Sequence, residues 1–146
     1  MDFDLEVKLA VYRQFAQTGK RPLPEDVSEI VSAAVGDVVE AYARLRSQRV
    51  LVLETDGRSI LMAPPFSGVD TQHVVVAGRL SYFANCAWDA LGIPAALHLP
   101  AIVHSRCEQS REPLRLEVSV DGPGSSEWLF HCLVPAAHWW ENIVFT

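Results

Sequence analysis

Two adjacent prolines, Pro64 and Pro65, separate a segment with helical hydrophobic spacing from one with strand-like alternation. Proline lacks the backbone N–H that helices and central strands use, so a proline pair marks a break between elements. Gly68 follows, and we interpret this stretch as a linker. It divides the 146 residues into two predicted parts, 1–65 and 66–146, enough for one ordinary domain or two very small ones.

The first part predicts three helices followed by a β-hairpin, an order that resembles a winged helix-turn-helix. Apolar residues recur at near-helical spacing, Gly19 ends the first helix, and Pro24 with its acidic neighbours suits the start of the second. Two apolar runs in residues 50–65 flank Asp56-Gly57, a strong tight-turn signal. The predicted helices cover residues 4–17, 24–34 and 36–50.

A winged helix raises the possibility of DNA binding, with Arg44, Arg46, Arg49 and Arg58 facing phosphates. However, residues 1–58 carry eight Lys or Arg against ten Asp or Glu, a net charge of −2, and the whole chain carries −6. Because affinity for DNA depends largely on neutralising phosphates, this balance argues against DNA as a partner. We favour a packing role for this region.

The second part predicts a small α+β domain with a mixed or antiparallel sheet. An apolar helix should cover residues 80–97, bent or ended by Pro94, and a final helical turn in 136–146 should lead into one more strand. Further strands are predicted at residues 73–78, 114–120 (which ends near the turn signal Asp121-Gly122) and 128–135.

Composition narrows the class of protein. Hydrophobic residues make up 49% and charged residues 21%, so the chain should form a core. No apolar run approaches the roughly 20 residues that span a bilayer, and the acidic N-terminus lacks the pattern of a signal peptide. We therefore expect a soluble cytoplasmic protein. In that reducing compartment Cys86, Cys107 and Cys132 should be free thiols, metal ligands or a nucleophile.

Cys86 and Asp89 stand three residues apart in the apolar stretch, so on a helix they share one face. A thiolate is a soft metal ligand and a nucleophile, and a carboxyl group in apolar surroundings tends to keep its proton. Together they suggest soft-metal chemistry, because acyl transfer would need a histidine base and nothing places His98 or His104 there. The alternative is a buried cysteine beside a capping aspartate, and spacing alone favours that alternative.

Other polar groups favour structural roles. His131, Cys132 and His138 do not match the paired spacing of zinc ligands, so we interpret them as strand and surface residues. Trp139 and Trp140 could line a pocket for an organic group, but we favour a place in the core under the sheet.

Three longer stretches carry a resemblance to a known family. They are YFANCAWDALGIPAAL, HSRCEQSREPLRLEVS and CLVPAAHWWENIVFT, in this order along the chain. Together they resemble the organomercurial lyases (alkylmercury lyases), which split carbon–mercury bonds. The likeness is specific over about residues 82–146, and the winged-helix-like N-terminal region agrees with the architecture of that family.

The resemblance implies roles for individual residues. Cys86 would bind the organomercurial, Asp89 would handle the proton that the leaving carbon receives, and Cys107 would be structural. The second metal-binding cysteine of the family would directly follow Thr146, so we expect a domain truncated at its C-terminus. A chain that naturally lacks this thiolate is the alternative, and Cys132 is the candidate substitute as a metal ligand.

The function that the resemblance implies is protonolysis of organomercurials to a hydrocarbon and Hg(II), which would pass to cytosolic thiols or a mercuric reductase. No organic cofactor is expected, since the carbon takes a proton. One alternative is a homologue that binds mercury or another soft metal without turnover. Another is a winged-helix, metal-responsive transcriptional regulator.

Overall fold

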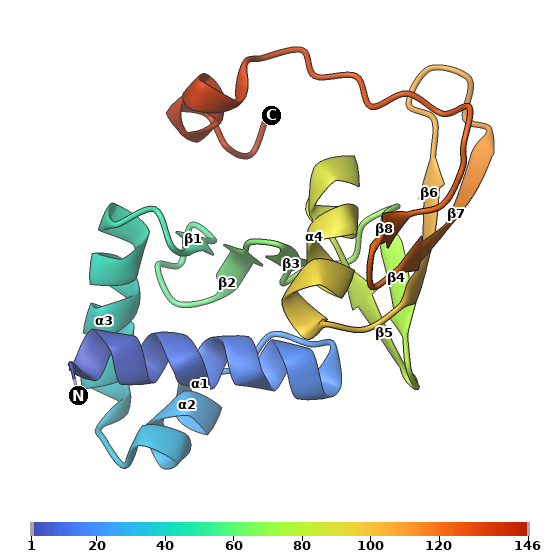
Figure 1. Cartoon of the computed structure of the whole chain (residues 1–146). Coiled ribbons are helices and arrows are strands. Elements are labelled where there is room, and N and C mark those ends of the chain that lie inside the picture. Colours follow the sequence, from blue (N-terminus) through green and yellow to red (C-terminus); the bar gives the residue numbers. More distant parts are fainter. Residues whose placement is uncertain (1, 146) are drawn as a thin grey trace.

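The computed structural model describes residues 2–145 and shows an α+β fold, in which three N-terminal helices precede two antiparallel sheets (Figure 1). The helices are α1 (Phe3–Thr18), α2 (Pro24–Val31) and α3 (Val35–Ser47). Each corresponds to a predicted helix. Gly19, at φ 73°, ends α1 as expected, because glycine adopts the left-handed conformation without a steric penalty.

A small antiparallel sheet follows α3. Its strands are β1 (Val52–Leu53), β2 (Ile60–Ala63) and β3 (Phe66–Ser67). β1 and β2 form the predicted hairpin, whose turn holds Gly57 at φ 66°. The carboxylate of Asp56 accepts hydrogen bonds from the hydroxyl and the backbone N–H of Ser59 and stabilises this turn. The stretch predicted as a linker instead contributes β3.

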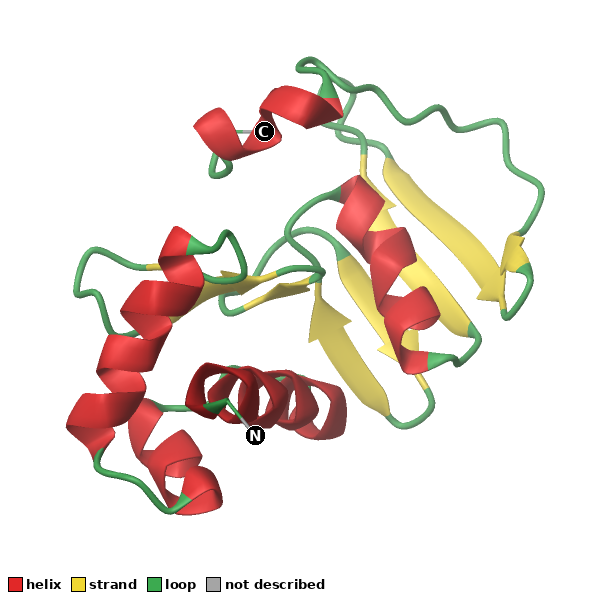
Figure 2. Ribbon diagram, turned by 60° about the vertical axis from the view of Figure 1, so that its left-hand side comes forward, coloured by secondary structure: helices red, strands yellow, loops and turns green. Residues whose placement is uncertain are grey.

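The larger sheet has the strand order β5–β4–β6–β7–β8, and every neighbouring pair is antiparallel. Its strands are β4 (Val74–Ala77), β5 (Leu80–Phe83), β6 (Ala101–Arg106), β7 (Pro113–Ser119) and β8 (Gly122–Pro123). β4 and β7 confirm two predicted strands. Helix α4 (Ala87–Leu97) lies across one face of this sheet (Figure 2).

The register of the larger sheet puts its small apolar residues under α4. Val75 pairs with Val103, and Ala77 pairs with Ala101, which pairs in turn with Val118. All five are buried. Directly paired residues share a face, so alternation places their neighbours on the opposite, more open face.

The two parts of the chain share one hydrophobic core. Phe15 of α1 stacks on Phe66 of β3 with ring centroids 5.3 Å apart, and the Tyr82 hydroxyl of β5 donates a hydrogen bond of 2.6 Å to the Ala16 carbonyl. At Gly19 a Cβ would lie 2.2 Å from the carbonyl oxygen of Ser81, so α1 ends directly against β5. The N-terminal helices therefore support strand β5, which leads into Cys86 and α4.

The predicted helix over 80–97 is wrong in its first part. Residues 80–83 form strand β5, which pairs with β4 across a turn at Gly78 (φ 60°). Pairing with a neighbouring strand outweighs local propensity here. Pro94 lies within α4 and neither ends it nor begins a new element.

The predicted C-terminal strands are also wrong. Residues 128–135 and 143–145 form no strand, and Thr146 lies outside the described residues. The helical turn is present as the 3-10 helix η1 (Ala136–Glu141). Trp139 and Trp140 are half-buried and do not belong to the buried core under the sheet. An apolar run becomes a strand only beside a partner, and within residues 2–145 this segment extends away from the sheet edge.

None of the helices in residues 2–145 combines the length and the hydropathy needed to cross a membrane. Two of the four arginines considered for DNA contacts are engaged within the chain. Arg44 makes a bidentate pair with Asp4, through contacts of 2.9 and 2.7 Å, and Arg58 pairs with Glu25.

Candidate active site

Cys86 and Asp89 lie at the N-terminal end of α4, just after the short connection from β5 to this helix. Cys86 is the N-cap residue, with extended backbone angles (φ −153°, ψ 178°), and Asp89 lies in the first turn. Asp89 is therefore the third residue of the helix, one turn from the N-cap position. The backbone N–H and the charge of Asp89 both act on the Cys86 thiol, so the two residues are close neighbours, and Cys86 precedes the helix instead of lying within it as predicted. Both side chains are half-buried, so neither is sealed from solvent.

The surroundings of Cys86 favour the protonated thiol. Burial raises the pKa of Cys86, and the negative charges of Asp89 and Cys132 raise it further, whereas the backbone N–H groups of Asp89 and Trp88 act in the opposite direction. A soft metal can still displace the proton, because it binds the thiolate and drives deprotonation. The group that receives this proton must then lie close by.

Asp89, whose charge acts on the Cys86 thiol, is the candidate acceptor. Burial raises the pKa of its carboxyl group, and a hydrogen bond from Asn85 partly opposes the rise. The Asn85 Nδ2 donates to Asp89 Oδ2 at 2.9 Å and to the carbonyl oxygen of Phe66 at 3.1 Å. A carboxylate with an elevated pKa is a stronger base, and its acid form persists to higher pH, which suits a group that takes and returns a proton.

The N-terminal helices contribute to the surroundings of this carboxyl group. The Tyr12 hydroxyl of α1 donates to the Pro64 carbonyl at 3.1 Å, and burial together with the charge of Asp89 raises its pKa to about 12. Tyr12 therefore stays a neutral donor at physiological pH. The turn formed by Pro64 and Pro65 (the proline corner) also packs closely on α4, because a Cβ at Gly92 would lie 3.1 Å from the Cβ of Pro65.

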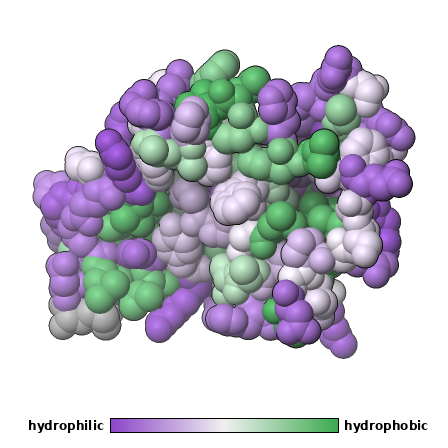
Figure 3. Space-filling model, turned by 45° about the horizontal axis from the view of Figure 1, so that its top comes forward, coloured by the Kyte–Doolittle hydropathy of each residue, from purple (hydrophilic) through white to green (hydrophobic). Residues whose placement is uncertain are grey.

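The C-terminal segment lies over the same end of α4. The rings of Trp88 and Phe130 are 5.8 Å apart between centroids, and Cys132 is near enough for its charge to affect the Cys86 thiol. Cys132 is exposed, and its Sγ donates to the Val134 carbonyl at 2.7 Å. Figure 3 shows apolar surface on the face that carries this segment. The exposed apolar side chains of the C-terminal segment include Phe130, Leu133, Val144 and Phe145, and Trp88 of α4 is also exposed.

Cys107 lies apart from this pair. It follows β6 in a tight turn, where hydrogen bonds from Ser110 lower the pKa of its thiol. All three cysteines are free thiols. His138 contacts Glu141 at 2.6 Å, and no cluster of three or more His, Cys, Asp or Glu within residues 2–145 could hold a metal ion. The zinc interpretation therefore finds no support in the described part of the chain.

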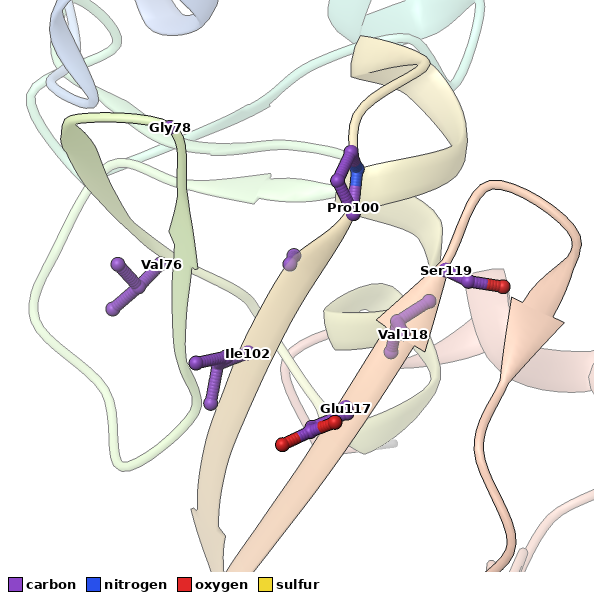
Figure 4. A pocket seen from close by; sticks show the side chains of 8 residues that line it. Val76, Gly78, Pro100, Ile102, Glu117, Val118 and Ser119 are labelled. Carbon is purple, nitrogen blue, oxygen red and sulfur yellow. The ribbon is translucent and has the colours of Figure 1, made fainter.

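An open hollow on the larger sheet is a separate feature (Figure 4). It lies where β4, β6 and β7 meet the loop that leaves α4, near Gly78, Pro100 and Ser119, whereas Cys86 is at the opposite end of that helix. Its wall contains one carboxylate, Glu117, and no thiol or imidazole. It therefore lacks the groups that soft-metal chemistry requires.

The family comparison covers the part of the chain that contains these thiols. The alkylmercury lyase family model matches residues 66–146, more than half of the chain. The chain belongs to the alkylmercury lyase family. This membership confirms the resemblance drawn from the three sequence stretches.

A solved structure agrees with the family in its fold. The mercury-bound form of MerB2 superposes with a TM-score of 0.65 at 21% sequence identity, over 84% of this chain. The match covers 60% of the MerB2 chain, so the present chain corresponds to only part of that protein. A search of curated proteins found no match.

Sequence reasoning proposed Cys86 and Asp89 for the candidate site but did not single out two residues that interact with the Asp89 carboxyl group. Asn85 stands directly before Cys86, and an amide four residues before an aspartate at a helix start was an available signal. Tyr12 looked like an ordinary core residue of α1, and nothing local indicated that the charge of Asp89 would raise its pKa. Its position depends on the packing of α1 against the proline corner.

Proposed function

We propose that this alkylmercury lyase family member cleaves carbon–mercury bonds by protonolysis at Cys86 and Asp89. The observation that carries the proposal is the shared location of the two groups. Cys86 is the N-cap residue of α4, Asp89 stands in the first turn of the same helix, and both are half-buried. That arrangement supplies a soft ligand for mercury and a proton carrier beside it.

The reaction proceeds in two steps with no change in oxidation state. Cys86 attacks the mercury of an organomercurial R–Hg–X, where X is a ligand such as a solution thiolate. The S–Hg bond forms as the Hg–X bond breaks, X⁻ leaves to solution, and the thiol proton passes to the Asp89 carboxylate. The Asp89 carboxyl then returns this proton to carbon as the C–Hg bond breaks, and the electron pair of that bond becomes the new C–H bond. The products are a hydrocarbon and Hg(II) bound to Cys86, and the steps need no organic cofactor.

We infer that Cys132 acts as a second thiolate for the Hg(II) product. Its thiol affects Cys86 electrostatically, and the Trp88–Phe130 contact holds its segment over the start of α4. Mercury bound by two sulfurs would leave by exchange with cytosolic thiols or a mercuric reductase, and we propose a cytoplasmic location in keeping with these partners. The test is retention of Hg(II) against excess monothiol: Cys132→Ser should lose most retention, and Cys107→Ser should keep it. Equal retention in both variants contradicts this role.

The direct test of the lyase is gas analysis. Protein incubated with methylmercury and excess thiol should release methane. Cys86→Ser and Asp89→Ala should each lower the rate of methane release by about 100-fold or more. Cys107→Ser, whose thiol lies in a separate turn, is the matched control and should retain activity. No methane from the unaltered chain would exclude the lyase function.

The second candidate is a mercury-binding protein without turnover, and the proximity of Cys86 and Cys132 favours it. Mass spectrometry should then show a mercury adduct that disappears in Cys86→Ser while no methane forms. The transcriptional regulator is less favoured, since Arg44 and Arg58 are already paired with carboxylates. No DNA mobility shift at low salt would exclude it.

A further inference from the structure

Asn85 connects the candidate proton carrier to the rest of the fold. It lies between β5 and α4, directly before Cys86, and its Nδ2 makes two hydrogen bonds. One goes to Asp89 Oδ2 at 2.9 Å and the other to the Phe66 carbonyl of β3 at 3.1 Å. Among the described residues it is the side-chain hydrogen-bond partner of Asp89.

The orientation of the Asn85 amide follows from its partners. The Phe66 carbonyl can only accept, so the donor Nδ2 must face it, and the same NH₂ group reaches Asp89. If the amide were rotated by 180°, its oxygen would face the Phe66 carbonyl oxygen, and two acceptors would lie against each other without a proton between them. The Asn85 Oδ1 is consequently buried without a hydrogen-bond partner, which is a free-energy cost. A residue that only stabilised the fold would not need to leave its carbonyl unpaired.

We propose that Asn85 is a positioning residue that occupies Asp89 Oδ2 and leaves Oδ1 to exchange the proton with the Cys86 thiol and the substrate carbon. This deepens the proposed function and rests on it. The Phe66 carbonyl fixes the amide, the amide fixes the carboxyl rotamer, and the carboxyl group stays on the Cys86 side of the helix end. Asn85 itself touches neither mercury nor carbon.

The competing explanation is that Asn85 only fastens the β5–α4 connection to β3. Thr71 offers a matched control for this explanation, because its side chain binds the same β5–α4 connection at Ala84, the residue before Asn85. The Thr71 hydroxyl donates to the Ala84 carbonyl at 2.6 Å. Thr71→Val removes that bond and leaves Asp89 and its amide partner untouched.

The experiment compares Asn85→Leu, Asn85→Ala and Thr71→Val with the unaltered full chain. Two quantities are measured with methylmercury: formation of the Cys86–mercury adduct by mass spectrometry, and kcat and KM for methane release. We expect both Asn85 variants to form the adduct with KM within about threefold, while kcat falls roughly 10- to 100-fold, as for lost positioning of a reacting group. Thr71→Val should keep kcat within about threefold.

Each other outcome has a definite meaning. An unchanged kcat in both Asn85 variants overturns the positioning role while the lyase function stands. An equal fall in kcat for Thr71→Val assigns the effect to the connection and also overturns it. If Asn85→Leu does not fold, the same comparison applies to Asn85→Ala. Absence of methane from the unaltered chain removes the lyase function and this inference together.

Discussion

At the residue scale, opposite electrostatic surroundings distinguish the site carboxyl group from a structural one. Asp89 is half-buried with a raised pKa, whereas the turn residue Asp56 accepts hydrogen bonds from Ser59 and Arg58 that lower its pKa to about 2. The fold therefore disfavours the charge of Asp89 and favours the charge of Asp56. Functional sites commonly retain such unfavourable charges.

This contrast predicts opposite pH dependence of stability. Burying charged Asp89 costs free energy above its folded pKa, and the cost disappears as pH falls below the unfolded value near 4. Asp89→Asn should therefore raise the melting temperature at pH 7 and have little effect near pH 3. Asp56→Asn should lower it at pH 7, with the difference shrinking as pH falls toward 2. Thermal melts across this range check both signs, and a destabilised Asp89→Asn at pH 7 would contradict the assigned burial.

At the element scale, the close approach of α1 to β5 depends on a glycine. Gly19 has φ 73°, and a Cβ there would lie 2.2 Å from the Ser81 carbonyl oxygen. We expect Gly19→Ala to lower the free energy of unfolding by more than about 1 kcal/mol, from backbone strain and the clash. Gly36, in the first turn of α3 with open space around it, is the control. Gly36→Ala should be neutral or stabilising by up to about 1 kcal/mol in urea denaturation, and equal effects at both positions would contradict the account.

The sequence predicted elements wherever the signal was local. The N-terminal helices and the Asp56-Gly57 hairpin follow from periodicity and turn residues, and the spacing of Cys86 and Asp89 places them together. Strand β5 was missed because its identity comes from pairing with β4, and the C-terminal strands were predicted from apolar runs that find no neighbouring strand in residues 2–145. The roles of Asn85 and Tyr12 depend on contacts distant in sequence, which a local pattern cannot contain.

At the scale of the whole molecule, the helices and the larger sheet share a core through the Phe15–Phe66 stack. We therefore expect one cooperative unfolding transition. The four tryptophans all lie after residue 87, so fluorescence reports the second half, while far-UV circular dichroism is dominated by the helices. The two denaturation curves should coincide, and separated midpoints would mean that the halves fold independently.

The same core makes the site dependent on α1. Phe15→Ala should destabilise the chain by about 3–5 kcal/mol, because it removes a fully buried ring and leaves a cavity. Both probes should shift by the same amount in chemical denaturation. Leu5, which is 42% exposed on the same helix, is the control, and Leu5→Ala should cost under about 1 kcal/mol. A shift confined to the circular-dichroism signal would contradict the shared core.

The proposed reaction depends on one transfer, in which Asp89 delivers a solvent-derived proton to the carbon of a mercurial held by Cys86. Its most direct measurement is headspace mass spectrometry of the gas released from methylmercury in D₂O, for the unaltered chain and for Asp89→Asn. We predict singly deuterated methane from the unaltered chain, and a Cys86–mercury adduct without gas from Asp89→Asn. Undiminished release of deuterated methane by Asp89→Asn would contradict the account.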